Sequence, residues 1–151
     1  MNKAGAVDCV IELLPEWGHS VAQLNALIAE KMGLSVRDMD ALNVLERQGS
    51  ATAKELGERV GLTSGSATRM IDRLEAAGFV QRVRDREDRR RVVIEATAVG
   101  LERAAGYYID LTRATRHDLS DFTVPELETI RRFLEHTSVN TSAELTRLRS
   151  E

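Results

Sequence analysis

Within one stretch of the sequence, the spacing of apolar residues changes from a helical period to a strand-like one. The segments "TAKELGERVG" (52–61) and "TSGSATRMIDRLEAAG" (63–78) both carry apolar residues at three- and four-residue intervals, and both end at a glycine. Directly after them, "FVQRVRD" and "RVVIEAT" are rich in β-branched residues, with the charged "DREDRR" between them. This order predicts two short helices joined by a tight turn, followed by a β-hairpin.

The residues before this motif also have a helical pattern. Ser35 with Asp38 three positions later predicts a capped helix that ends near Gly49. An apolar stripe precedes it over residues 17–32. The pattern leaves open whether the segment before Pro15 is a separate helix or an extension of the next one.

The helical period returns after Thr97 and persists to the end of the chain, with a second start signal at "TVPE" (123–126). These terminal stripes have no partner within so small a domain, which predicts that they bury their apolar faces against a second chain. We therefore expect a mainly α fold with a small β-hairpin, a winged helix-turn-helix with dimerisation helices at both ends. The predicted parts are an N-terminal dimerisation helix region (1–33), a DNA-binding domain (34–97) and C-terminal dimerisation helices (98–151).

The charge of the chain is distributed unevenly, although the net charge of -3 does not by itself suggest a nucleic-acid binder. Arginine supplies 18 of the 21 basic residues. From Arg69 to Arg91 there are eight arginines against five carboxylates, so this segment carries +3 and the rest of the chain -6. Because nucleic-acid binding depends on the face that meets the phosphates, this sorting predicts a basic DNA-binding surface.

The second helix of the turn motif (63–78) has two different faces. Hydroxyl groups near a helix start can donate to phosphates, and an arginine further along can bind a guanine edge with two parallel hydrogen bonds. Gly65 weakens a helix, which indicates that something approaches the backbone closely there. The apolar face consists of Ala67, Met70, Ile71 and Leu74. We predict that the opposite face contacts DNA through Thr63, Ser64, Gly65, Ser66, Thr68, Arg69 and Arg73. The alternative is a solvated face on which Arg73 pairs with neighbours such as Asp72 or Glu75.

The loop of the predicted hairpin concentrates arginine. A narrow loop of this kind can enter a minor groove, where the negative potential favours arginine. We predict DNA contacts for Arg84, Arg86, Asp88, Arg89 and Arg90, and we expect the Asp88 carboxylate to brace the Arg90 side chain. The alternative is a hairpin tip whose mixed charges only prevent edge-to-edge pairing.

The run "TSGSATRMIDRLEAAGFVQRVRDREDRRRVVIEATAVG" (63–100) resembles the recognition helix and wing of the MarR family of bacterial transcription regulators. The wing of that family reads approximately Arg-x-x-Asp-x-x-Asp-Arg-Arg, then a strand, then Leu-Thr-x-x-Gly. Ala96 stands where leucine is usual. The matching residues are Arg82, Asp85, Asp88, Arg89, Arg90, Thr97 and Gly100.

The resemblance implies a homodimer that binds double-stranded DNA at a pseudo-palindromic operator, more as a repressor than as an activator. The two helices that begin at Thr63 would enter successive major grooves, and the wings with Arg89 and Arg90 would enter the flanking minor grooves. A two-fold dimer of this kind needs half-sites about 34 Å apart.

Many members of the family release DNA when a small aromatic acid or phenol binds. Candidate residues for such an effector are Trp17, His19, Arg37, Tyr107 and Tyr108. The alternative places Trp17 and Tyr108 in the core or in a dimer interface, with His19 and Arg37 in solvent.

Cys9 raises a second possibility, because some members of the family sense peroxides through a cysteine in the first helix. Cys9 is the only cysteine in the chain, and no tyrosine precedes Tyr107. A structural or incidental thiol is the better interpretation, and a cysteine-based redox regulator is kept as an alternative function.

Other classes of function have little support. Three scattered histidines (His19, His117 and His136) offer no metal-binding spacing, no catalytic constellation is present, and no cofactor motif is found. We expect no targeting segment, no membrane contact and a cytoplasmic location. A winged-helix module that binds an acidic protein instead of DNA is the remaining alternative.

Overall fold

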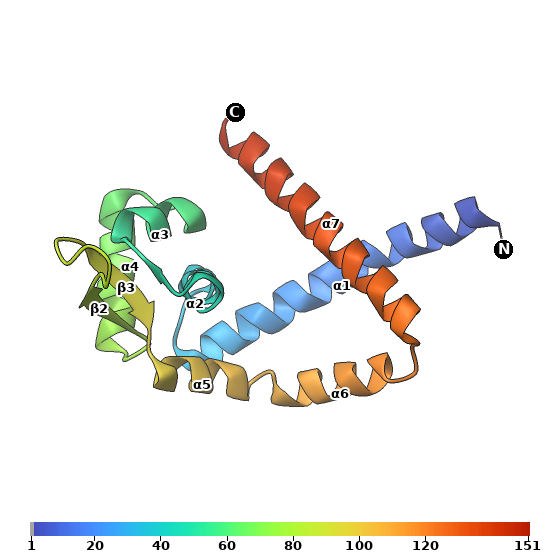
Figure 1. Cartoon of the computed structure of the whole chain (residues 1–151), viewed down its shortest axis with the longest axis horizontal. Coiled ribbons are helices and arrows are strands. Elements are labelled where there is room, and N and C mark those ends of the chain that lie inside the picture. Colours follow the sequence, from blue (N-terminus) through green and yellow to red (C-terminus); the bar gives the residue numbers. More distant parts are fainter. Residues whose placement is uncertain (1) are drawn as a thin grey trace. The chain divides into compact units, whose positions relative to one another are not determined.

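The computed structural model describes residues 2–151 and is mainly helical, with one small antiparallel sheet (Figure 1). The residues up to Tyr107 form one compact unit, and Tyr108–Glu151 form a second. The fold class predicted from the sequence is confirmed. In chain order the elements are α1 (Lys3–Met32), α2 (Val36–Gln48), β1 (Ser50–Ala51), α3 (Ala53–Val60), α4 (Ser64–Ala76), β2 (Val80–Arg84), β3 (Val92–Ala96), α5 (Ala98–Gly106), α6 (Ile109–Leu119) and α7 (Val124–Arg149).

Helices α3 and α4 form the predicted helix-turn-helix. The Thr52 hydroxyl and the Glu55 carboxylate make a reciprocal capping box at the start of α3. Gly61 ends α3 with a φ of 71°, a left-handed conformation that glycine adopts without strain. The two helices approach so closely that a Cβ atom built on Gly57 would lie 2.8 Å from Cβ of Ala67.

The core of the first unit lies beneath α4. The predicted apolar face of this helix is fully buried, with Ala67, Met70, Ile71 and Leu74 each at most 2% exposed. Phe79 and Ile94 are each 1% exposed and belong to the same core. Burying side chains of this size is the main source of stability for such a domain.

The sheet has three strands in the order β1-β3-β2, with both pairs antiparallel. The predicted hairpin is β2 and β3, paired in the register Arg82 opposite Ile94. Strand β1 was not predicted. It pairs Ser50 with Glu95 and is only two residues long, too short to show an alternating pattern.

The first turn of α5 is locked against the end of the hairpin. The Thr97 hydroxyl accepts a hydrogen bond from the Gly100 N–H (2.9 Å) and donates one to the Gly78 carbonyl (2.7 Å). A Cβ atom on Gly100 would lie 2.8 Å from Cα of Phe79, so only glycine fits there. Thr97 and Gly100, two residues of the motif described above, therefore hold the wing and α5 together.

Helix α1 is continuous from Lys3 to Met32, with Pro15 inside it. The residues before Pro15 are therefore an extension of the same helix. Only the C-terminal end of α1 is buried, at Ile28, Ala29 and Met32. Upstream, Trp17 is 60% exposed.

In the C-terminal part of the chain, the stripe over 101–119 is divided into α5 and α6 at Tyr107 and Tyr108. The sequence did not predict this break, which follows Gly106, a weak helix former. The predicted capping box at Thr123 and Glu126 is present at the start of α7. No residue of α6 or α7 is buried. None of the helices within residues 2–151 has the length and apolar character needed to cross a bilayer.

We predict that Gly57→Ala lowers the free energy of unfolding by about 1–3 kcal/mol, because the new methyl group forces α3 and α4 apart. Gly65→Ala is the matched control. A Cβ atom on Gly65 would meet only Nη1 of Arg69, at 3.9 Å. This variant should gain up to about 1 kcal/mol from the better helix propensity of alanine. Urea denaturation of both variants is the measurement, and equal stability of Gly57→Ala and the wild type would contradict the packing described for α3 and α4.

Candidate nucleic-acid interface

The outward face of α4 begins with a cluster of hydroxyl groups. Thr63 occupies the N-cap position, as predicted, but its hydroxyl makes no hydrogen bond to the backbone of α4. It donates instead to Oγ of Ser66 (3.1 Å), which also accepts from Nη2 of Arg69 (3.2 Å). The Thr68 hydroxyl donates to the Ser64 carbonyl (3.1 Å). The first-turn amides of α4 therefore receive no side-chain cap from Thr63, which leaves this helix start suited to an anion.

Gly65 lies exposed within this cluster. Apart from its chain neighbours and the nearby backbone of its own helix, the nearest described atom to the position of its missing Cβ is Nη1 of Arg69, at 3.9 Å. Internal packing therefore does not explain why glycine stands there, unlike at Gly57 and Gly100. A close approach from outside the chain is the explanation that the sequence suggested, and it stays a prediction.

Arg73 lies in the next turns of α4 and is turned back toward α2. Its Nη2 donates to Oδ1 of Asp38 (2.6 Å) and its Nε to Oδ2 of Asp38 (3.4 Å). The alternative from the sequence, in which Arg73 pairs with Asp72 or Glu75, names the wrong partner for Arg73. Those two carboxylates bind Arg82 instead.

Arg82, the first arginine of the wing motif, joins α4 to β2. Its Nη2 donates to Oδ1 of Asp72 (2.6 Å), and its backbone N–H donates to Oε1 of Glu75 (3.0 Å). Its Nη1 forms a further ion pair with Glu75. The bond to Asp72, followed by those to Glu75, raises the pKa of the Arg82 guanidinium above its usual value. The wing strand is thereby fixed to the helix that precedes it.

The loop between β2 and β3 is a turn built on two carboxylates, and it projects from the domain in Figure 1. Asp85 accepts hydrogen bonds from the N–H groups of Glu87 (2.8 Å) and Asp88 (3.4 Å). The Glu87 N–H is the main reason why the pKa of Asp85 lies below its usual range, and the Asp88 N–H and the charge of Arg91 lower it further. The Arg84 Nη1 donates to the Arg89 carbonyl (2.9 Å) across the loop.

The predicted ion pair between Asp88 and Arg90 is not formed. Asp88 accepts instead from the backbone N–H of Arg90 (3.0 Å). A carboxylate two residues before an amide closes a local turn of this kind more readily than it reaches the end of an arginine side chain. Asp88 therefore shapes the loop backbone and leaves the Arg90 guanidinium outside the turn.

Arg91 anchors the base of the wing, a role that the sequence analysis did not assign. Its Nη2 lies 3.4 Å from Oε1 of Glu55 in α3, and its Nε lies 4.0 Å from Oδ2 of Asp85. Glu55 also accepts from Thr52, and these bonds, followed by the charge of Arg91, lower the pKa of Glu55. The contact spans 36 positions in the sequence, so no local pattern could have revealed it.

The arginines of the helix-turn-helix and wing thus fall into two groups. Arg73, Arg82 and Arg91 are held by carboxylates within the chain. Across residues 2–151, no ion pair or hydrogen bond holds the guanidinium groups of Arg89 and Arg90, which are exposed. Arg86 is exposed too, and it lines a polar hollow of about 490 Å³ together with residues such as Glu46 and Glu95.

The candidate effector residues are distributed over α1, α2 and the segment between α5 and α6. Trp17 and His19 are exposed on α1, and Arg37 donates from Nη1 to the Val60 carbonyl at the end of α3. Tyr108 precedes α6, where partial burial raises the pKa of its phenol. Tyr107 is 44% exposed. As an effector set they stay a prediction.

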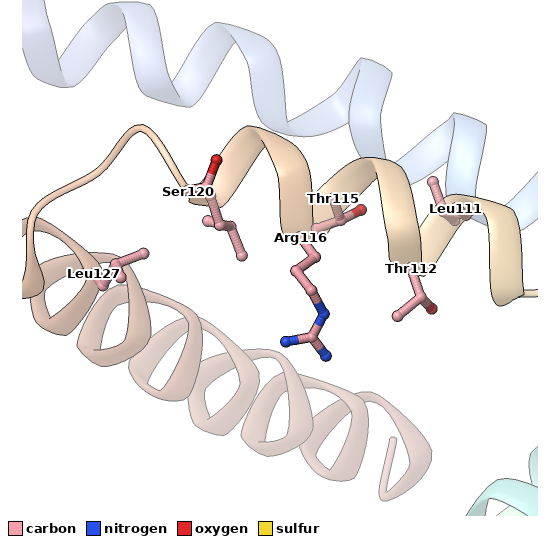
Figure 2. Close-up of a pocket in the computed structure, with 7 residues that line it drawn as sticks. Leu111, Thr112, Thr115, Arg116, Ser120 and Leu127 are labelled. Atoms are coloured by element: carbon pink, nitrogen blue, oxygen red, sulfur yellow. The ribbon is translucent and has the colours of Figure 1, made fainter.

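A hollow of about 590 Å³ lies within the second unit, along α6 (Figure 2). Leu111, Leu119 and Leu127 give it an apolar lining, and the Arg116 side chain extends from α6 toward α7. None of the candidate effector residues lines it. The remaining lining residues are Thr112, Thr115 and Ser120.

A reactive thiol and a metal site are the two other kinds of functional group that a chain of this composition could carry. The Cys9 side chain is exposed on α1, and the chain contains no second cysteine. No group of three or more His, Cys, Asp or Glu residues within 2–151 is arranged to hold a metal ion.

Comparison with known proteins gives consistent matches. Residues 34–92 match the family described as "MarR family". The chain is 33% identical over 139 residues to the HTH-type transcriptional regulator YcgE of Bacillus subtilis (strain 168), covering 92% of this chain and 90% of the relative.

Solved structures share the fold. A MarR family protein from Bacillus stearothermophilus superimposes with a TM-score of 0.68 at 23% identity, covering 94% of this chain and 99% of that one. A MepR mutant from S. aureus, bound to an oligodeoxyribonucleotide, has a TM-score of 0.58 at 17% identity and covers 87% and 97%.

We predict that Asp85 titrates below the usual aspartate pKa of about 3.9. The charged form stabilises the turn, so this stabilisation is fully present above the pKa of the unfolded state and is lost as the pH falls through the lower folded value. The measurement is an NMR titration of the amide signals of Glu87 and Asp88. Asp85→Ala should abolish their shared transition while leaving that of Glu126 unchanged. A transition at or above the usual value would contradict the turn described here.

Proposed function

Because the chain belongs to the MarR family of transcriptional regulators, we propose that it binds double-stranded DNA as a homodimer and represses transcription at a pseudo-palindromic operator. The observation that carries the proposal is the combination of an uncapped, hydroxyl-rich start of α4 with a wing whose Arg89 and Arg90 side chains have no ion pair or side-chain hydrogen bond among the described residues. That a MepR mutant of the same fold is bound to an oligodeoxyribonucleotide supports it.

Helix α4 supplies the major-groove contacts in this proposal. Ser64 and Ser66 lie in its first turn, where short hydroxyl side chains reach phosphates or base edges. Gly65 lets the backbone approach the phosphates closely, and the amides beside it point toward them. Arg69 hydrogen-bonds only within its own helix, to Ser66, so its remaining donors are available to a guanine edge.

The wing supplies the minor-groove contacts. Arg82 and Arg91 tie its base to α4 and α3, so the loop is held in place before DNA arrives. Preorganisation of this kind lowers the ordering cost of binding. No carboxylate within residues 2–151 forms an ion pair with the Arg89 or Arg90 guanidinium and competes with phosphate for it. These groups therefore lose only water when they enter a groove.

The homodimer is supported by the second unit. Helices α6 and α7 have no buried residue, although they carry several large apolar side chains. Leu111 is 49% exposed, Leu134 49% and Leu145 50%. Amphipathic helices without a core of their own need a partner surface, and a second copy of the chain offers a matching one.

Release by a small aromatic acid or phenol is the finer part of the proposal, supported by the family alone. A ligand acts in such a dimer only by binding one arrangement of the two α4 helices better than another. A thiol-based switch at Cys9 is a competing function. An acidic protein partner for the wing is another, which the titration below distinguishes from DNA binding.

The test is a fluorescence-anisotropy titration of the purified protein against DNA from around its own gene, at several salt concentrations, with a random duplex as control. Tight and selective binding that weakens steeply with salt is the expected result, because several phosphate contacts release counterions. Binding no better than to the random duplex calls for selection from a random DNA pool. Failure to enrich any sequence there overturns the proposal and favours an acidic protein partner.

Arg90→Ala should weaken binding to the selected duplex by about 1–3 kcal/mol, because one wing contact is lost. No intramolecular bond of the Arg90 side chain is lost at the same time, so the thermal unfolding curve should not move. Anisotropy and differential scanning calorimetry on the same preparation provide both readouts. Equal DNA affinity in variant and wild type would defeat the wing assignment.

Leu119→Asp should convert the dimer to a monomer, because it places a charge in the apolar hollow along α6. Leu119 is 37% exposed in the single chain, so the variant loses little intramolecular packing. Val36→Asp, at a 50% exposed position on α2 outside the predicted dimerisation helices, is the matched control. Sedimentation velocity gives the oligomeric state, and a Leu119→Asp protein that remains dimeric would show that the dimer is formed elsewhere.

A further inference from the structure

The first turn of α2 holds a buried carboxylate that the interface described above does not use. Asp38 has no exposed surface. Its Oδ2 accepts from the Ser35 N–H and the Ser35 hydroxyl (both 2.8 Å), which completes the cap of α2. The remaining acceptor capacity is directed at one cation, the Arg73 guanidinium of α4. A buried carboxylate that serves two helices at once fixes their relative position.

The arginine of this pair is committed to Asp38 by its geometry. Arg73 uses both Nε and Nη2 toward the carboxylate, at 3.4 and 2.6 Å. Reading a guanine requires two parallel donors on one edge of the guanidinium, and here the Nε–Nη2 edge is already occupied. Arg69, one turn earlier, differs because it bonds only to Ser66 of its own helix. The Arg73 side chain is 52% exposed, but turning it toward DNA would leave the carboxylate of Asp38, whose side chain is 1% exposed, without its cation.

The same turn of α2 also holds the other helix of the motif. The Nη1 group of Arg37 donates to the Val60 carbonyl, one of the last backbone acceptors of α3. Two consecutive residues of α2 therefore bind the two helices of the helix-turn-helix, Arg37 to α3 and Asp38 to α4. The orientation of α4 is set from this turn as well as by the packing of its apolar face.

We propose that Asp38 and Arg73 are a positioning pair, in which Asp38 holds Arg73 so that α4 presents Ser66 and Arg69 to the major groove, and Arg73 itself reads no base. The inference rests on the proposed function and goes beyond it, since it removes Arg73 from the predicted base contacts. It also assigns a role in DNA selectivity to a residue that is fully buried and cannot touch DNA.

The test is a double-mutant cycle on two duplexes, one enriched by the wild type from a random pool and one unrelated. The variants are Asp38→Asn, Arg73→Ala and the double variant. Each single variant should lose about tenfold in affinity for the enriched duplex, with little change in affinity for the unrelated one. The double variant should lose no more affinity than the single variant that binds more weakly. Affinity for single-base variants of the enriched duplex should fall in the same rank order as in the wild type.

Two further variants separate positioning from simple loss of stability. Ser35→Ala weakens the cap of α2 but leaves the Asp38 carboxylate facing Arg73, so it should lower the melting temperature and keep the ratio of affinities for the two duplexes. Arg69→Ala removes one of the contacts that the pair is proposed to position, so Asp38→Asn should cost less affinity in the Arg69→Ala background than in the wild type. All titrations are run well below the melting temperature of each variant, which circular dichroism provides.

Three results would overturn the proposal. Loss of discrimination at one base pair in Arg73→Ala, with no effect of Asp38→Asn, would make Arg73 a reader. Additive effects of the two substitutions would mean that the pair does not act as a unit. Equal losses on both duplexes would show a merely structural role. A wild type that enriches no sequence defeats the proposed function first, and the positioning role falls with it, whereas the cycle on a selective wild type judges the pair alone.

Discussion

Burial of one face of α4 is the constraint on which the rest of the first unit depends. Four side chains from Ala67 to Leu74 are removed from water, and the close approach of Gly57 to Ala67 brings α3 against the same helix. Once this face is fixed, the opposite face must point outward. The carboxylate contacts to Arg73 and Arg82 then restrain the helix from two sides, through α2 and through β2.

The elements that could be predicted from the sequence are those specified by neighbours along the chain. The capping boxes at Thr52 and Thr123 act over three residues, and the apolar period of α4 repeats within one helix. Both can therefore be recognised from a short stretch of sequence. The hairpin can be recognised for the same reason. Strand β1 cannot be recognised from the sequence, because a two-residue strand exists only through its pairing with β3.

The site was predicted less completely, since its side chains are arranged by contacts between distant positions. Asp38 and Arg73 lie 35 positions apart, and Glu55 and Arg91 lie 36 apart. The sequence placed Arg73 on the correct helix but among the wrong neighbours. Asp88 was predicted to pair with the Arg90 side chain. It accepts a hydrogen bond from the Arg90 backbone amide instead, because the loop closes in a local turn. Charge composition predicted a basic segment from Arg69 to Arg91, but it did not predict which of its arginines are paired with carboxylates.

The division of the arginines has an evolutionary consequence. Substitution of Arg89 or Arg90 breaks no ion pair or hydrogen bond of their guanidinium groups within residues 2–151, so selection can vary the wing tip without a penalty in folding. Substitution of Arg82 releases Asp72 and Glu75 at the same time and disturbs the junction of helix and strand. Under the proposed function, recognition and stability are thus encoded by different arginines of one short segment, and related chains can diverge in the first while conserving the second.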